Sequence, residues 1–91
     1  MTLSERMAVL IKLGEHLRGE DEYLRAVMHR THFHNKWFTI ENQELAINAI
    51  AEKFLDAQKL TQWLNTYHID DNIQPQRIGL VLAGNIPLVG F

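Results

Sequence analysis

One apolar run near the end of the chain limits the fold more than any other feature. Residues 78–83 read Ile-Gly-Leu-Val-Leu-Ala, and such a near-continuous apolar stretch is typical of a strand buried on both faces of a parallel sheet. The turn-like sequence Gly84-Asn85-Ile86-Pro87 interrupts it. No other stretch of these residues is a partner strand, and unpaired backbone groups are costly to bury. The run therefore predicts a strand that requires the rest of a sheet or another copy of itself.

The first of four predicted helices begins at the N-terminus. Thr2 and Glu5 fit a capping box. Apolar residues then recur every three or four positions from Leu3 to about Arg18, where Gly19 is the expected stop. The residues expected on its apolar face are Leu3, Met7, Leu10, Gly14 and Leu17.

The second predicted helix starts at Asp21, an expected cap, with Glu20 and Glu22 favourably placed near the positive helix end. It continues through Arg30 and extends at most to Asn35. The residues expected on its buried side are Leu24, Val27 and Met28, with Tyr23 on the flank.

Two more helices are predicted before the apolar run. Thr39 is the expected cap of a third helix that reaches about Leu55, and Asp56 is the expected cap of a fourth. The residues expected to be buried are Ile47, Ile50, Ala51 and Phe54 in the third, and Leu60, Trp63, Leu64 and Tyr67 in the fourth. Residues 68–76 are polar, contain Pro75 and predict a surface connection.

Composition restricts the chemistry of this chain. It has 91 residues, a net charge of −2 and no cysteine, so a Cys nucleophile is excluded within it. Its nine Lys and Arg are spread along the sequence, without the basic stripe of a nucleic-acid-binding protein. We therefore expect no nucleic-acid partner.

No apolar stretch approaches the ~20 residues of a membrane span, and no signal peptide is recognisable, so a cytoplasmic protein is expected.

Histidines and aromatic residues each suggest a site that we weigh against a plainer interpretation. His29, His32 and His34 lie close together, but no carboxylate or thiol is near in sequence, and Arg30 and Lys36 oppose a cation. We expect ordinary surface or helix-end histidines and no metal site. The aromatic residues are expected in interhelical packing rather than in a recognition platform, and they are Trp37, Phe38, Trp63 and Tyr67.

Two segments resemble a known family. Residues 35–42, Asn-Lys-Trp-Phe-Thr-Ile-Glu-Asn, and residues 79–90, which include Ala-Gly-Asn-Ile-Pro-Leu, are similar to the N-terminal region of the LuxC-like fatty acyl-CoA reductases of bacteria. These enzymes are a branch of the aldehyde dehydrogenase superfamily. The resemblance extends over essentially all 91 residues but only over the N-terminal part of such an enzyme. It implies that this chain is a truncated fragment of a larger oxidoreductase.

With this resemblance, the predicted elements give a fold and three regions. We expect a mainly α fold of about four helices, followed by one short β-strand that would begin an α/β dinucleotide-binding domain in the intact parent. Residues 1–67 form the helical N-terminal region and residues 68–76 the linker. Residues 77–91 form the first strand and the Gly-Asn-Ile-Pro turn of the truncated domain.

The resemblance also implies a reaction and site residues. The intact parent would reduce fatty acyl-CoA to the aldehyde with NADPH through a Cys thioester, and that Cys lies outside this chain. Asn85 matches the Asn-x-Pro turn of the superfamily and is expected to donate its amide to the developing oxyanion. Gly84, Ile86 and Pro87 are expected beside the cofactor, although residues of these types also form simple turns. The 91-residue chain alone is expected to be inactive and to bind no cofactor.

The alternative hypothesis is a standalone helical interaction module. Its strand would add to the edge of a partner's sheet. Both hypotheses share one expectation, a homo-oligomer that associates through residues 77–91, because exposed apolar edges tend to pair.

Overall fold

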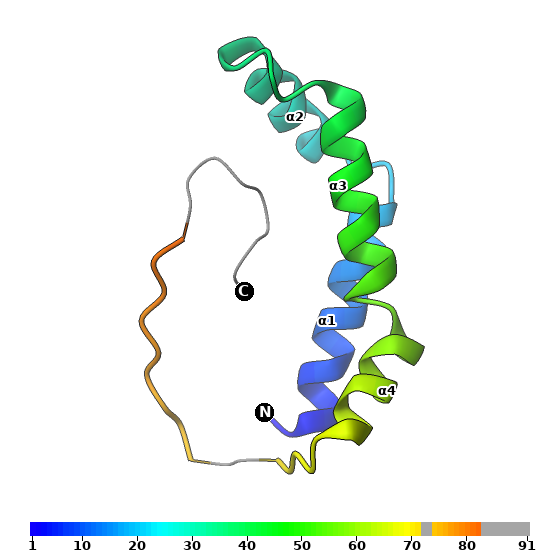
Figure 1. The fold of residues 1–91 in the computed structure, drawn as a ribbon, viewed down its shortest axis with the longest axis vertical. Helices are drawn as coiled ribbons and strands as arrows, with labels where there is room; N and C mark the ends of the chain where they lie inside the picture. The colour runs from blue at the N-terminus through cyan, green and yellow to red at the C-terminus, as the bar shows by residue number, and fades with distance from the viewer. Residues whose placement is uncertain (72–73, 83–91) are drawn as a thin grey trace.

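The computed structural model describes residues 1–71 and 74–82 of the chain. Its helices are α1 (Leu3–Arg18), α2 (Glu22–His34), α3 (Ile40–Lys53) and α4 (Ala57–Thr66). α3 packs along α1 and also contacts α2, while α4 contacts α1 (Figure 1). The turn between α2 and α3 lies at one end of the molecule and α4 lies near the other. The mainly α prediction is confirmed for the described residues.

Each helix begins at the predicted capping residue. The Thr2 hydroxyl accepts a hydrogen bond from the Glu5 N–H at 3.1 Å, and the Glu5 carboxylate accepts one from the Thr2 N–H at 2.7 Å. Asp21, Thr39 and Asp56 accept from backbone N–H groups in the first turns of α2, α3 and α4. Because such caps satisfy otherwise unpaired donors and contribute about 1 kcal/mol each, the sequence defines where all four helices start.

The end of α1 is where it was predicted, but the conformation of Gly19 is not the usual one. Its φ is −75° and its ψ is 165°, an extended conformation that any residue can adopt. The Gly19 N–H donates to the carbonyl oxygens of Glu15 and His16, both at 3.1 Å. These two bonds close the helix, so its end does not depend on the left-handed conformation for which glycine is favoured at this position.

A small core joins α1, α2 and α3. Its buried apolar residues are Leu17, Met28, Ile47, Ala51 and Leu55, with Leu10, Leu13, Leu24, Ile40 and Ile50 packed against them. Gly14 allows the chain after α3 to approach α1 closely, since a Cβ on Gly14 would lie 2.8 Å from the Leu55 Cβ and 3.0 Å from the Leu55 carbonyl oxygen. Leu10, Gly14 and Leu17 of the stripe predicted for α1 therefore face the core as expected.

The prediction that Phe54 is buried is wrong. α3 ends at Lys53, Phe54 follows as its C-terminal cap, and its side chain is exposed. Leu55 is buried in its place. The reason is that the regular spacing of a helix stops applying once the chain leaves the helix, and the bend before α4 turns the next residue towards α1.

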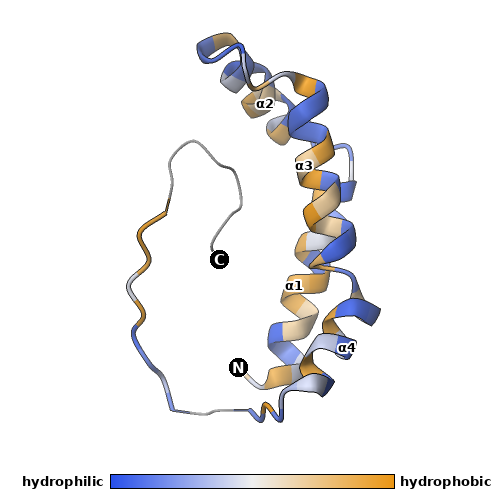
Figure 2. Cartoon of the chain, in the orientation of Figure 1, coloured by the Kyte–Doolittle hydropathy of each residue, from blue (hydrophilic) through white to orange (hydrophobic). Residues whose placement is uncertain are grey.

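Residues 74–82 contain neither helix nor strand. The predicted strand at residues 78–83 is therefore not formed over its described part, and Ala83 lies outside the described residues. Ile78, Leu80, Val81 and Leu82 are all exposed. Figure 2 shows these apolar residues on a segment that runs apart from the helices. A strand needs a neighbouring backbone that pairs with its N–H and C=O groups. Within the described residues, no backbone segment pairs with residues 74–82.

Candidate functional site

The residues predicted to act in catalysis and cofactor binding lie beyond the described part of the chain. Asn85 and its neighbours Gly84, Ile86 and Pro87 belong to residues 83–91, outside the described residues. Their proposed roles in oxyanion stabilisation and cofactor binding stay predictions. The structure does describe how the chain leaves the helices on its way to these residues.

A polar anchor ties the chain after α4 to the start of α1. The Asp71 carboxylate accepts a hydrogen bond from the Leu3 N–H at 2.7 Å. The Arg6 guanidinium donates through Nη2 to the carbonyl oxygens of Asp70 at 3.3 Å and of Asp71 at 2.9 Å. The negative carboxylate lies at the positive end of the α1 dipole, where it is favoured. Because the partners are more than 60 residues apart in sequence, the sequence pattern gave no signal for this anchor.

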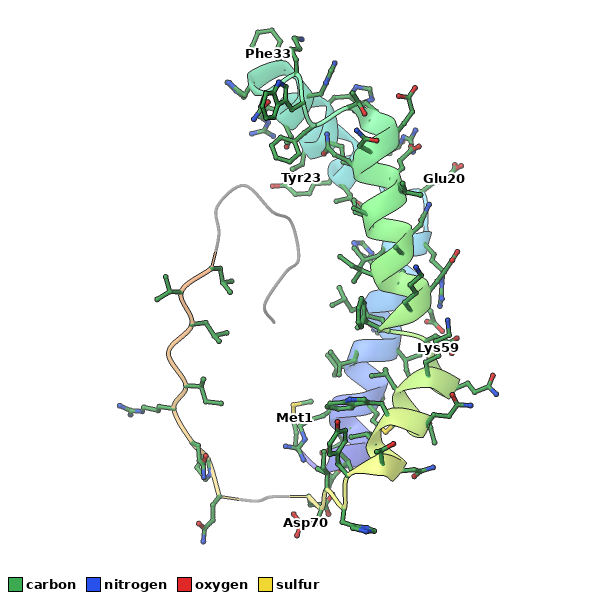
Figure 3. All side chains as sticks on the ribbon, in the orientation of Figure 1. Met1, Glu20, Tyr23, Phe33, Lys59 and Asp70 are labelled. Carbon is green, nitrogen blue, oxygen red and sulfur yellow. The ribbon has the colours of Figure 1, made fainter. Side chains whose placement is uncertain are left out.

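The anchor lies at the start of the predicted linker, residues 68–76. Ile69 also donates through its N–H to the Tyr67 carbonyl oxygen at 2.7 Å. The residues up to Asp71 are thus fixed against the N-terminal end of the molecule, as the position of Asp70 near Met1 in Figure 3 shows. The apolar segment therefore departs from a defined place on the helical unit.

The aromatic residues of α4 are exposed, contrary to the prediction that they pack between helices. The Trp63 and Tyr67 side chains are 56% and 52% exposed, and their ring centroids lie 5.3 Å apart. The remainder of the α4 stripe, Leu60 and Leu64, is half-buried. α4 has only 10 residues and contacts α1, and within the described residues this contact leaves the two aromatic side chains of its stripe largely uncovered. Trp63 and Tyr67 instead form an exposed pair.

A buried glutamine connects α2 to α3. The Gln43 side chain donates through Nε2 to the Met28 carbonyl oxygen at 3.0 Å and to the Phe38 carbonyl oxygen at 2.8 Å. Sequence reasoning did not identify this residue. A signal was present, because Gln43 lies three residues after Ile40 and four before Ile47, so it is a polar residue within an apolar helical stripe.

The three histidines near the end of α2 do not converge. His29 and His34 are exposed and His32 is half-buried. The His32 Nδ1 lies 3.2 Å from the Phe38 carbonyl oxygen, and the His34 ring contacts the Phe33 ring edge to face at 5.4 Å. Within residues 1–71 and 74–82, no three His, Cys, Asp or Glu side chains are grouped so that they could hold a metal ion.

Comparisons with known protein families, with curated proteins and with solved structures find no match to this chain. The resemblance described above therefore rests on the sequence segments themselves. None of the helices in the described residues is long and apolar enough to cross a membrane.

Proposed function

We propose that this chain is the N-terminal region of a LuxC-like fatty acyl-CoA reductase, a cytoplasmic enzyme that reduces fatty acyl-CoA to the aldehyde with NADPH. In this proposal the helices brace a dinucleotide-binding domain whose first strand starts near residue 77. The nucleophilic Cys belongs to the remainder of the enzyme, so the 91-residue chain alone is inactive. The segments at residues 35–42 and 79–90 are the basis for the family.

The exposed apolar segment is the structural observation that supports this proposal best. Residues 78–82 belong to the near-continuous apolar run that is typical of a strand buried on both faces, and Val81 is fully exposed. Soluble domains rarely leave contiguous apolar residues in water unless another surface covers them. A sheet that receives this segment as its first strand would cover them and pair their backbone groups.

Asn85 has the central role among the residues of this chain. Its amide N–H would donate to the oxygen of the thioester carbonyl as negative charge develops there. Gly84, Ile86 and Pro87 would set the turn that carries Asn85 and would lie beside the NADPH. Ligands of open α/β sheets bind at the carboxyl ends of the strands, and Asn85 follows directly after the predicted one.

The test uses the intact protein encoded at the source locus. Its reading frame is expected to continue beyond Phe91 and to encode a Cys in an aldehyde-dehydrogenase-like setting. NADPH oxidation in the presence of a fatty acyl-CoA is expected to fall about 10²–10³-fold in the Asn85→Ala variant, the usual cost of one lost oxyanion donor. Asn48→Ala, which changes an exposed residue of α3, is the matched control and should keep full activity. Turnover of Asn85→Ala within about twofold of wild type would exclude this role, given the same expected cost.

A second candidate is a helical interaction module that self-associates through residues 77–91. The exposed side chains of Ile78, Leu80 and Leu82 favour it, because unpaired apolar strands join the edges of other sheets. In light scattering, the 91-residue chain is expected to form a dimer or a larger species. A double variant, Leu80→Glu with Leu82→Glu, should shift it to monomer.

The control for this second candidate is Gln74→Glu with Gln76→Glu, which adds the same charge to exposed polar positions of the same segment. It should leave the oligomer intact. A wild-type chain that stays monomeric at high concentration would contradict self-association. If a stop codon follows the Phe91 codon directly, the reductase proposal fails for this chain and the interaction module takes its place.

A further inference from the structure

The last turn of α2 and the turn that follows it present two exposed aromatic side chains at one end of the molecule. Phe33 is 73% exposed and Trp37 is 88% exposed. Figure 3 shows Phe33 at the opposite end of the molecule from Met1 and Asp70. We call Arg30, Phe33, Lys36 and Trp37 the aromatic tip. Trp37 was predicted to pack between helices, and its exposure requires a different explanation.

A hydrogen-bonded turn holds the aromatic tip in place. The Asn35 side-chain oxygen accepts from the Trp37 N–H at 3.0 Å, and its carbonyl oxygen accepts from the Phe38 N–H at 3.1 Å. The Phe38 carbonyl oxygen in turn accepts from buried Gln43 at 2.8 Å. These bonds fix the backbone on both sides of Trp37. Its exposure is therefore imposed by an ordered turn and not by a frayed helix end.

The part of the chain that carries the two rings is basic. From residue 23 to residue 40 the chain contains three basic residues, Arg25, Arg30 and Lys36, and no Asp or Glu, although its net charge is −2. Arg25 forms a salt bridge with Glu44 at 3.2 Å, whereas Arg30 and Lys36 have no ion-pair partner within the described residues. The Lys36 Nζ lies 5.6 Å from the Phe33 ring centroid, so an ammonium group and an apolar ring share one surface.

The opposite end of α2 has the opposite charge. Glu20, Asp21 and Glu22 lie at its start, and its 13 residues separate them from the tip by ~20 Å at the usual helical rise. An anionic surface would attract the tip and repel this acidic end. Glu41, in the first turn of α3, is the nearest acidic residue of the chain after the tip.

We propose that the aromatic tip docks this protein on membrane surfaces that contain anionic lipids. Phe33 and Trp37 enter the headgroup layer, where amphipathic aromatic rings are favoured. Arg30 and Lys36 contact the lipid phosphates, with the attraction of cationic side chains to a negative leaflet. A single-stranded nucleic acid would instead require a basic groove that follows its backbone, whereas this tip is the end of α2 and the turn after it, at one end of the molecule (Figure 1). The docking is shallow and does not depend on the proposed reductase function.

The experiment is vesicle co-sedimentation of the 91-residue chain. Vesicles of phosphatidylcholine with phosphatidylserine are expected to bind the chain, and phosphatidylcholine vesicles are expected to bind it much more weakly. Arg30→Gln and Lys36→Gln should each weaken binding about fivefold, the effect of one cation near such a surface. Phe33→Ala with Trp37→Ala should abolish it, and Glu41→Gln should strengthen it.

Matched controls change the same residue types elsewhere. Trp63→Ala removes an exposed tryptophan of α4, and Lys12→Gln removes an exposed lysine of α1, so both should bind as wild type does. The proposal is overturned if the chain does not bind anionic vesicles, if it binds neutral vesicles equally well, or if the control variants lose binding to the same extent. It is also overturned if a single-stranded oligonucleotide is bound and vesicles are not.

A second measurement does not rely on variants at the tip. The chain has two tryptophans, so Trp63→Phe leaves Trp37 as the sole indole fluorophore. Its emission is expected to shift to shorter wavelength when phosphatidylserine vesicles are added, since the ring leaves water. Far-ultraviolet circular dichroism confirms that each variant is folded. An unshifted emission spectrum with anionic vesicles would contradict insertion of Trp37.

Discussion

Two apolar parts of this molecule have similar side chains and opposite environments. In the helical core, Leu17 is 8% exposed, whereas Leu80 in the segment 74–82 is 61% exposed. The difference lies in the backbone. A helix pairs its own N–H and C=O groups and can bury an apolar face against any other helix. An extended segment must first find a second extended chain, so its hydrophobicity alone does not bury it.

The same contrast appears at two glycines. Gly14 lies against Leu55, with no room for a Cβ, while a Cβ on Gly79 would meet no atom within 4 Å. Between the two regions lies the anchor of Asp71 on the α1 N-terminus. This anchor lies where the chain leaves the packed helices.

The largest expected effect comes from truncating one leucine in each region. Leu17→Ala removes buried methyl groups and leaves a cavity, so it should lower the free energy of unfolding by about 2–5 kcal/mol. Leu80→Ala removes exposed atoms and should change it by less than about 0.5 kcal/mol. Urea denaturation followed by circular dichroism at 222 nm measures both. Equal losses would mean that the segment is packed in solution, and the contrast between the two regions would be broken.

A smaller effect is expected from adding one methyl group to each glycine. In Gly14→Ala the new Cβ would overlap Leu55, and overpacking of this kind typically costs about 1–3 kcal/mol. The better helix propensity of Ala offsets about 1 kcal/mol of this cost. We therefore expect the free energy of unfolding to fall by up to about 2 kcal/mol, the difference between the overpacking cost and the gain in helix propensity.

Gly79→Ala is the control for this change, since the methyl group enters open space. The same denaturation experiment should show no loss of stability for it. A stabilised Gly14→Ala protein would indicate that α1 and the chain at Leu55 are farther apart in solution than 2.8 Å between these Cβ positions implies.

The smallest effect concerns the anchor between the two regions. Asp71→Asn keeps a side-chain oxygen near the Leu3 N–H but removes the negative charge from the end of the α1 dipole. We expect the free energy of unfolding to fall by about 0.3–1 kcal/mol in low salt. This decrease becomes smaller as salt screens the charge. Glu15→Gln removes a negative charge at an exposed position of α1 and is the matched control. If the free energy of unfolding falls by the same amount in both variants at every salt concentration, the charge of Asp71 adds nothing to stability.

Local patterns predicted most of the helical fold. The starts of all four helices follow from Thr2, Asp21, Thr39 and Asp56, because a cap is a contact between residues two or three positions apart. The predicted inner stripe of α1 contains Gly14 and Leu17, which are buried. These features need no information about distant parts of the chain.

The candidate sites were harder to predict from sequence. Spacing alone suggested that Trp37 and Trp63 pack between helices, but both side chains are exposed. Gln43 was overlooked although it interrupts an apolar stripe, since its two acceptors lie 15 and 5 residues away. The role of Asn85 depends on the family resemblance and stays a prediction.

By itself, the sequence determined the four helices, their caps and most of their inward faces, because these depend on hydrogen bonds and periodicity within one or two turns. Only the tertiary structure decided that Leu55 replaces Phe54 in the core. It also decided that Asp71 and Arg6 join the chain after α4 to the start of α1, and that the Trp37 side chain is exposed. Each of these depends on which segments meet in space. Contacts between residues far apart in sequence produce no periodic pattern in that sequence, so only the folded structure shows them.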